Sequence, residues 1–389
     1  MSVTAVAHQI PFARPWVTDE DRAAVLEVLH GHILTHGPQC RAFEQQFSAF
    51  LGASAHSVTV SSCMAALHLS YLHFGIGPGD DVIVPAQTHV ATVHAVEWVG
   101  ATPVFVDCDP ATGNMTPADI AVAVTPQTKA ISVVHFAGIP CDMPAIMEVA
   151  DRHGLKVIED CAIALGARLD GTHVGLFGDA GCFSFYPVKH ITTGEGGMFV
   201  SRHARAAEKV EKLRAFGVDR SHSERAVPGM YDVPELGLNY RMSEMQAALG
   251  RVQMGRFHEN LARRRANFAA LKAALAGIPG VRVLDARATS VTSSPYCLIA
   301  TLEGVAAGRR NDIVLRLNAR GIGTSIYYPQ PVPRMAYYRG KYGYDARRFP
   351  GAEAISDASL ALPVGPHVTE DDMGQIAEAF GTAILEGSQ

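Results

Sequence analysis

The sequence predicts an α/β fold in which a mainly parallel sheet is covered by helices and is followed by a smaller C-terminal α+β domain. Between about residues 82 and 200, short apolar or β-branched runs alternate with helical patterns, and residues 244–275 then form one long, charged helical pattern. Apolar strands separated by helices are typical of parallel sheets, which bind ligands beyond the carboxyl ends of their strands. We therefore expect a large domain over residues 1–255, a small domain over residues 256–389, and a site at the strand ends.

Capping residues mark the first and last helices. Thr18 and Asp21 stand at capping-box spacing before AAVLEVL, and Thr369 and Asp372 have the same spacing before the C-terminal helical pattern. In chain order, the expected strands are DVIVP, PVFVD, KAISVVHF, LKVIED, AGCFSF and GGMFV. The pattern over 244–275 predicts a single helical spine that joins the two domains.

Composition limits the function classes. The chain has 389 residues, of which 48% are hydrophobic and 18% charged, as in ordinary folded proteins. Its net charge of -5 comes without a basic block, so we expect a small-molecule substrate and no nucleic-acid partner. Seven cysteines without a CxxC pair predict neither a disulfide framework nor a zinc ribbon, which favours a cytoplasmic location. We also expect no membrane partner, since no run of eighteen apolar residues occurs.

Asp160 and Lys189 carry the chemical hypothesis. Asp160 ends the run LKVIED, and Lys189 stands in FSFYPVKHITTGEGGM. An aspartate beside a pyridine nitrogen favours the protonated, electron-withdrawing ring, because opposite charges stabilise each other in a low-dielectric pocket. A lysine can bond to the aldehyde of pyridoxal 5'-phosphate (PLP), yield to a substrate amine and then carry a proton. A strand-end aspartate and a surface lysine are also common without any such role, so the surrounding motifs have to decide.

A phosphate site is predicted at the start of the helical run AALHLSYL. Ser62 is expected to cap this helix, and the backbone amides of Cys63 and Met64 would then face an anion. Ser184 could add a hydroxyl. An ordinary capped helix has the same spacing, so this pattern alone leaves both interpretations open.

The chain resembles the DegT/StrS family of PLP-dependent sugar aminotransferases nearly from end to end. The motifs that carry the resemblance are FARPWVTDEDRAAVLEVL, LTHGP, FEQQFSAFLGA, SSCMAALHLS, DDVIVPAQTHVAT, GATPVFVDCDP, KAISVVHFAGIPCDM, VIEDCAIALGA, FSFYPVKHITTGEGGM, GLNYRMSEMQAALG and RGIGTSIYYPQP. The resemblance implies the fold-type I architecture of aspartate aminotransferase, with a large domain built on a seven-stranded sheet.

The resemblance also implies a role for each matching residue. Lys189 would bond to the cofactor aldehyde, Asp160 would pair with the ring nitrogen and His89 would stack on the ring. The residues expected at the cofactor phosphate are Cys63, Met64 and Ser184, with Asn239 reaching the phosphate of a neighbouring subunit. These roles imply a homodimer with composite active sites.

The implied reaction moves an amino group from L-glutamate to a keto sugar, with pyridoxamine 5'-phosphate as the loaded form of the cofactor. The sugar would be a nucleotide-linked 4-keto-6-deoxyhexose, and the product an amino sugar for a surface polysaccharide or a glycosylated natural product.

Four positions depart from the family pattern. Ile163 stands where a glutamine or histidine usually contacts the ring hydroxyl, and Met64 replaces a threonine. Tyr327 and Pro333 replace two histidines near the sugar. We take Tyr327 and His190 as candidate substrate contacts, and a non-nucleotide keto sugar or sugar acid stays an alternative substrate.

Other functions fit the sequence less well. Sugar dehydratases of the same family carry histidine at the position of Lys189, so the lysine favours amine transfer. The histidines of HGHILTH, at 30, 32 and 36, have no HExxH motif or carboxylate cluster beside them, and we expect no metal. GEGGMF lacks the spacing of a nicotinamide-binding loop. A non-catalytic regulator with this fold stays an alternative that only a measurement of turnover would exclude.

Overall fold

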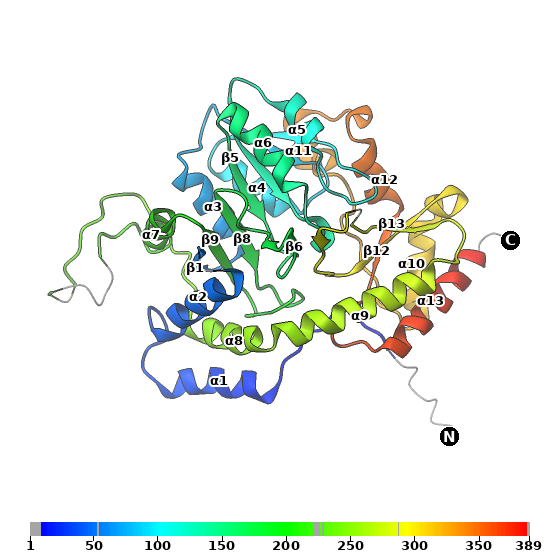
Figure 1. Ribbon diagram of the computed structural model, residues 1–389, viewed down its shortest axis with the longest axis horizontal. Coiled ribbons are helices and arrows are strands. Elements are labelled where there is room, and N and C mark those ends of the chain that lie inside the picture. The colour runs from blue at the N-terminus through cyan, green and yellow to red at the C-terminus, as the bar shows by residue number, and fades with distance from the viewer. Residues whose placement is uncertain (1–8, 53, 221–225, 228, 287, 387–389) are drawn as a thin grey trace.

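The computed structural model describes residues 9–52, 54–220, 226–227, 229–286 and 288–386. Its centre is a seven-stranded sheet in the order β1-β9-β8-β5-β4-β2-β3 (Figure 1). The strands are β1 His56–Val60, β2 Asp81–Pro85, β3 Thr102–Val106, β4 Thr128–Val134, β5 Lys156–Asp160, β8 Ala180–Ser184 and β9 Gly197–Ser201. β9 runs antiparallel to both its neighbours, whereas the other adjacent pairs are parallel. The expected α/β fold with a mainly parallel sheet is confirmed.

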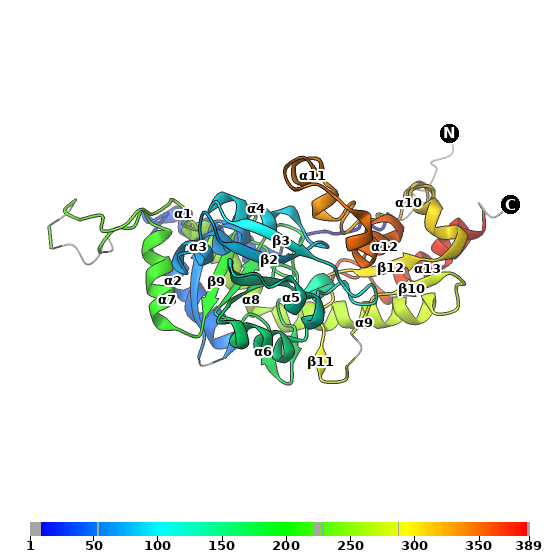
Figure 2. The ribbon, with the colours of Figure 1, turned by 90° about the horizontal axis from the view of Figure 1, so that it is seen from above.

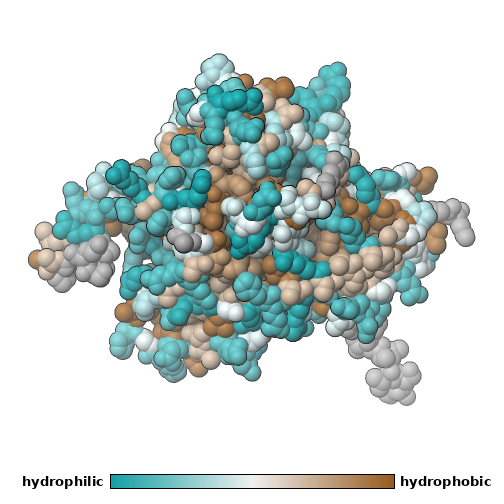
Figure 3. Space-filling view, in the orientation of Figure 1, coloured by the Kyte–Doolittle hydropathy of each residue, from teal (hydrophilic) through white to brown (hydrophobic). Residues whose placement is uncertain are grey.

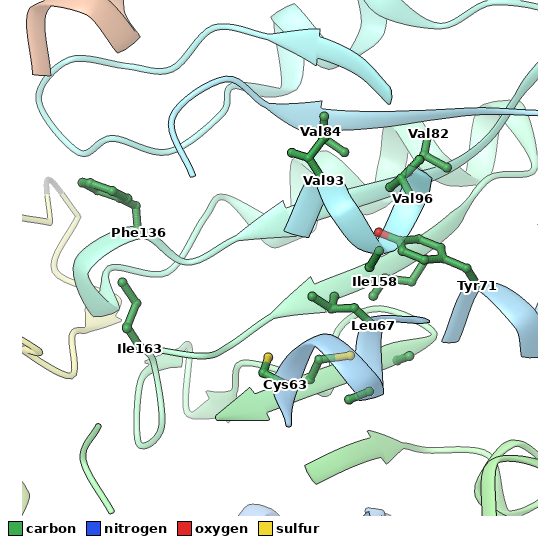
Figure 4. Close-up of a cluster of buried hydrophobic side chains, with 14 of the residues drawn as sticks. Cys63, Leu67, Tyr71, Val82, Val84, Val93, Val96, Phe136, Ile158 and Ile163 are labelled. Carbon is green, nitrogen blue, oxygen red and sulfur yellow. The ribbon is translucent and has the colours of Figure 1, made fainter. Parts of the chain in front are cut away.

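Each face of the sheet is covered by helices because the strands are apolar on both sides. On β2, Val82 and Val84 join one buried cluster with residues of α3 (Cys63–His73) and α4 (Val90–Trp98), as Figure 4 shows. Ile83, which points to the opposite face, packs in a second cluster with residues of α6 (Met143–His153). The alternation therefore explains why this run reads as continuously apolar.

The large body contains further helices. They are α1 Asp19–His30, α2 Pro38–Leu51, α5 Pro117–Ala123, α7 Ala204–Leu213 and α8 Glu244–Gly255, with a 3-10 turn η1 at Phe136–Gly138. The first helix has the predicted capping interaction, since the Thr18 amide donates to Asp21 Oδ2 at 2.7 Å. After α7, the chain extends away from the body before it returns to α8 (Figures 1 and 2).

A second, antiparallel sheet with the order β10-β12-β13 organises the C-terminal part. Its elements are β10 Val281–Val283, β12 Leu298–Leu302, α10 Arg310–Ala319, α11 Ala336–Tyr342, α12 Pro350–Ala358, β13 Ser359–Leu362 and α13 Glu370–Leu385, with 3-10 turns η3 Gly304–Arg309, η4 Val332–Arg334 and η5 Ala346–Arg348. The cap of α13 is also as predicted, since the Thr369 amide donates to Asp372 Oδ2 at 2.7 Å. The α+β character expected here is present.

The helical spine differs from the prediction because it is broken into two helices. α8 ends at Gly255 and α9 spans Phe257–Leu275, while Arg256 between them has φ -108° and ψ 14°. At the break, Arg256 pairs with Asp21, and Phe257 is fully buried. In one continuous helix, the pairing of Arg256 with Asp21 and the burial of Phe257 would both have to fit a single helical register. The break lies one residue beyond the expected boundary at 255, and the division into two domains stays a prediction.

A small sheet of β11-β6-β7 was not predicted. β6 (Arg168–Leu169) and β7 (Thr172–His173) pair with β11 (Val291–Thr292), so residues far apart in the sequence meet at one edge. Within the part of the chain that the structure describes, every helix is too short or too polar to span a lipid bilayer. Hydrophobic and hydrophilic residues are interspersed over the face in Figure 3.

Candidate active site

Asp160 is a buried carboxylate at the carboxyl end of β5, with 5% of its surface exposed. Its Oδ2 accepts a hydrogen bond from the Thr92 hydroxyl at 2.8 Å, and its Oδ1 accepts one from the Ala162 amide at 3.0 Å. The Cys63 thiol lies 3.8 Å from the same Oδ1. Within the described ranges no lysine or arginine forms an ion pair with Asp160. Because a buried anion is unfavourable without a cation, this carboxylate is suited to a positively charged ligand.

Lys189 lies in the turn that follows β8, where its amide donates to the Tyr186 carbonyl at 2.9 Å. Burial lowers the pKa of its ammonium below the ordinary value, and the negative charge of Asp160 acts in the opposite direction. The two side chains therefore interact electrostatically in one buried site. The Lys189 ammonium also lies 5.0 Å from the centroid of the Tyr296 ring. A lysine whose pKa is lowered is a better nucleophile, because more of it is unprotonated near neutral pH.

The start of α3 forms a cradle for an anion. The Ser62 hydroxyl caps the helix by accepting from the Ala65 amide at 3.1 Å, and the amides of Cys63 and Met64 lie in the first turn, where no carbonyl of the same helix reaches them. Gly197 of β9 packs against this turn. A Cβ at that position would lie 2.4 Å from the Ser62 carbonyl carbon and 2.6 Å from the Cys63 nitrogen, so only glycine fits.

Ser184 lies beside this cradle. It is the last residue of β8 and pairs in register with Gly197, the residue that packs against the start of α3. Its Oγ is 3.4 Å from the Tyr186 amide, a long contact that leaves the hydroxyl able to bind another group. The predicted phosphate residues Ser62, Cys63 and Ser184 are thus brought together.

His89 precedes α4, and its ring lies against that of Tyr328. Its Nδ1 accepts from the Ala91 amide at 3.2 Å, and the two ring centroids are 5.5 Å apart. Burial and the nearby charge of Lys189 lower the pKa of His89, which favours the neutral imidazole. A neutral aromatic ring suits stacking on a cofactor.

These residues fit PLP. The buried carboxylate of Asp160 has no cationic partner within the described residues, as a protonated pyridine nitrogen requires. The start of α3 and Ser184 offer donors to a phosphate, and Lys189 offers an amine to an aldehyde.

The other predicted residues have different surroundings. Asn239 is exposed on the segment that follows α7, and its backbone forms a bridge with Ala215. His190 is 2% exposed, and its Nε2 lies 3.0 Å from the Ser294 hydroxyl, so its ring packs inside the protein. A contact of His190 with the substrate remains a prediction. The Tyr327 hydroxyl lies 2.7 Å from the Tyr296 hydroxyl.

Comparisons with known proteins identify this arrangement. The family model of the DegT/DnrJ/EryC1/StrS aminotransferase family matches residues 15–381. The chain belongs to this family. It is 36% identical over 376 residues to the spore coat polysaccharide biosynthesis protein SpsC of Bacillus subtilis (strain 168), with 96% of each chain covered.

Solved structures of the family have the same fold. The putative sugar aminotransferase Spr1654 from Streptococcus pneumoniae in its PMP form superposes with a TM-score of 0.92 at 28% identity, over 97% of this chain and 99% of that one. DesI, solved in the presence of its TDP-sugar product, gives a TM-score of 0.87 at 32% identity, over 100% and 95% of the two chains. The protein is therefore a PLP-dependent sugar aminotransferase.

The structure shows the surroundings of one of the four departures from the family pattern. Ile163 is 3% exposed and packs in the same apolar cluster as Phe136, both of which Figure 4 labels. Its side chain offers no hydrogen bond.

Sequence reasoning missed three aromatic or hydroxyl residues of this family member's site. Thr92 orients Asp160, Tyr296 lies beside Lys189, and Tyr328 faces His89. Of these three residues, only Thr92 could have been noticed in the sequence, because it places a hydroxyl in an apolar helical run, four residues after Thr88. In the structure the hydroxyls of Thr88 and Thr92 lie 2.9 Å apart.

The histidines at 30, 32 and 36 are exposed, and His36 Nε2 lies 3.0 Å from the Arg241 guanidinium. A different buried group, His135, Glu159 and Cys161, has metal-ligand spacing. The Glu159 carboxylate already accepts three backbone amides at 2.7 to 2.8 Å and contacts His135 Nε2 at 3.0 Å. Its oxygens are thus occupied by the fold.

Proposed function

We propose that the protein transfers the amino group of L-glutamate to a nucleotide-linked 4-keto-6-deoxyhexose. The observation that carries the proposal is the electrostatic interaction of Lys189 with Asp160, a buried carboxylate that forms no ion pair at contact distance in the described chain. DesI was solved with a TDP-sugar product, and SpsC acts in spore coat polysaccharide biosynthesis, which supports a nucleotide sugar and a polysaccharide product. A glycosylated natural product is the other destination that we consider.

Each residue has a role that follows from its surroundings. Asp160, held by Thr92, would keep a proton on the pyridine nitrogen, since a fixed anion stabilises a cationic ring. Lys189 would attach the cofactor and would then move protons at the substrate carbon. When bound, PLP stabilises the negative charge that develops on that carbon.

The other residues bind and orient. The amides of Cys63 and Met64, the Ser62 cap and the Ser184 hydroxyl would hold the phosphate, because a helix N-terminus favours an anion. His89 would cover one face of the ring. Tyr327 remains our candidate for the sugar side of the pocket, where its hydroxyl is already paired with Tyr296.

We also propose a homodimer with composite sites. The segment after α7 exposes large apolar side chains that a solitary chain would leave in water, namely Val227 (58%), Met230 (65%), Tyr231 (53%), Val233 (50%) and Leu236 (91%). Exposed apolar groups that cluster in this way are typical of protein interfaces. Asn239 lies at the base of this segment, where its amide could reach the phosphate of a second copy. We place the dimer in the cytoplasm, since the seven cysteines are buried free thiols.

The test is a screen of keto sugars, nucleotide-linked and free, with L-glutamate as donor and mass spectrometry of the products. We expect an amino sugar from the nucleotide-linked 4-keto-6-deoxyhexose and formation of 2-oxoglutarate in equal amount. The proposed acceptor is wrong if only free sugars or sugar acids are aminated. The proposed reaction is wrong if the sugar loses water and gains no nitrogen.

A further inference from the structure

A second polar recess lies outside the set of residues assigned to the cofactor. Its interior has a volume of about 10 Å³, which admits one water-sized atom. The recess is formed by the N-terminal segment, the turn before Lys189, α9 and the loop before α13. Its polar side chains are Arg14, Arg264 and His367. Val188 and Tyr296 also line the recess, so it lies next to the surroundings of Lys189.

Arg264 of α9 is a buried cation without a counter-ion. Arg264 is 5% exposed. Its Nε donates to Asn260 Oδ1 at 2.8 Å, and its Nη1 donates to the Tyr296 carbonyl at 2.9 Å. Both acceptors are neutral, and among the described residues no carboxylate pairs with the guanidinium and no acceptor binds Nη2. Burial lowers the pKa of Arg264 to about 10, which reflects the unfavourable position of the charge. A bound anion would supply the missing opposite charge.

His367 gives an independent sign of a ligand. Its Nε2 lies 2.9 Å from the Pro11 carbonyl, which can only accept, so Nε2 carries a proton. Nδ1 is buried and has no hydrogen-bond partner. Buried polar atoms without a partner are rare in folded proteins, and this one lies in the wall of the recess.

The two polar side chains converge on one point. A Cβ at Gly365 would lie 2.6 Å from His367 Nδ1 and 3.8 Å from Arg264 Nη2, so the absence of a side chain keeps open the space between them. Arg14 adds an exposed guanidinium to the same wall and, within the described chain, forms no ion pair. Two guanidinium groups and an imidazole thus line a space that admits one oxygen atom of an anion.

We propose that this recess binds a small oxyanion, a carboxylate or a phosphate group. Guanidinium groups match the planar, paired oxygens of such anions and bind them by charge-assisted hydrogen bonds. The oxyanion is either part of the amino-acid donor or a free anion of the cell. Binding can be measured without turnover, so the proposal does not depend on the proposed reaction.

The experiment measures anion binding to the PLP-loaded protein by isothermal titration calorimetry, so that the phosphate cradle at α3 is already filled. The probes are succinate, which has no amine and cannot react with the cofactor, and inorganic phosphate. We expect one saturable site in the wild type. The dissociation constant should rise about fivefold in Arg14→Gln and about tenfold or more in Arg264→Gln, as expected for the loss of one exposed and one buried charge-assisted contact.

Two further variants serve as controls. Arg205→Gln removes an exposed arginine of α7 that forms no ion pair within the described chain, and this variant should bind both probes as the wild type does. If Arg264→Gln does not fold, Arg264→Lys, which retains the positive charge, is titrated in its place. The proposal is overturned if the wild type binds neither probe, or if the Arg14 and Arg264 variants bind them as tightly as Arg205→Gln does.

The source of the anion follows from the donor half-reaction. If the recess receives the donor, the KM for the amino acid in Arg14→Gln rises in parallel with the dissociation constant for succinate. If the ligand is a free anion, that KM stays at the wild-type value while anion binding is weakened. Either result supports an oxyanion site, and the titration alone decides whether it exists.

Discussion

Replacement of Thr92 by valine tests whether Asp160 acts through a fixed orientation. Valine has nearly the shape of threonine, so the variant removes the hydroxyl without leaving a cavity. The Thr92 hydroxyl lies 2.8 Å from Asp160 Oδ2, and both residues are buried. A hydrogen bond to a charged group contributes about 1.5 to 3 kcal/mol, whereas a neutral one contributes about 1 kcal/mol.

The magnitude follows from the number of donors. Asp160 keeps the Ala162 amide on Oδ1, but Oδ2 loses the donor that holds it. The hydrogen bond from Thr92 to Asp160 contributes about 2 to 3 kcal/mol. If its loss weakens the binding of PLP by half of that amount, the affinity for PLP falls about tenfold, since 1.4 kcal/mol corresponds to a factor of ten. We expect kcat to fall as well, because a carboxylate that can rotate stabilises the protonated ring less well.

Thr301→Val is the matched control. Thr301 lies in β12, is 3% exposed, and its hydroxyl is buried without a hydrogen-bond partner. The same chemical change there should leave PLP binding unchanged and should raise the free energy of unfolding slightly, because an unsatisfied polar atom is removed. Equilibrium dialysis of PLP against the apoprotein and single-turnover kinetics measure the two effects. Equal PLP affinity in both variants would refute the positioning role of Thr92.

Four further outcomes are expected. Borohydride should fix the cofactor on the peptide that contains Lys189, and Lys189→Ala should lose turnover but still bind PLP; a label on another lysine contradicts the assignment. Gly197→Ala should weaken PLP binding and cost about 1 to 3 kcal/mol of stability through overpacking, whereas Gly374→Ala, in open space on α13, should stabilise by about 0.5 to 1 kcal/mol. Lys189→Ala mixed with Asn239→Ala should regain part of the activity; proven heterodimers without recovery exclude composite sites. Burial lowers the pKa of His173 from 6.5 to about 3. On acidification the unfolded chain therefore binds the proton at a higher pH than the folded chain does, and the free energy of unfolding should fall as the pH drops from about 6.5 to about 3. Urea titrations of His173→Gln should show a smaller fall over the same range.

The strands of the sheet could be predicted because burial on both faces leaves a local signature. The apolar residues of DVIVP and LKVIED pack against helices. β2 spans the whole of DVIVP, and β5 spans LKVIED except for its first residue. The direction of β9 was less visible, although the sequence has no helical pattern between AGCFSF and GGMFV. A connection without a helix returns antiparallel, whereas a parallel neighbour needs a crossover. The reversal at β9 follows from that connection.

The site was predictable where its chemistry is carried by motifs and hidden where it depends on tertiary contacts. Lys189, Asp160 and the Ser62 cap stand in motifs that the sequence displays. Thr92 and Asp160 are 68 positions apart, and Tyr296 reaches Lys189 from another part of the fold. The break at Arg256 was missed for the same reason, since the helical pattern continues through it and the contact with Asp21 comes from α1.

The two buried charges without counter-ions support each other as signs of ligands. A charged side chain at either position would be visible in the sequence, but its burial and its lack of a partner arise only when the chain folds. Among the described residues, the Asp160 carboxylate forms no ion pair and the Arg264 guanidinium pairs with no carboxylate. Leaving a charge in this state is unfavourable by an amount comparable with the stability of a whole domain unless a ligand compensates it. For Asp160 the family supplies that ligand as PLP. The same reasoning applied to Arg264 predicts that the folded protein is more stable with succinate or phosphate bound, and that this stabilisation is smaller in Arg14→Gln.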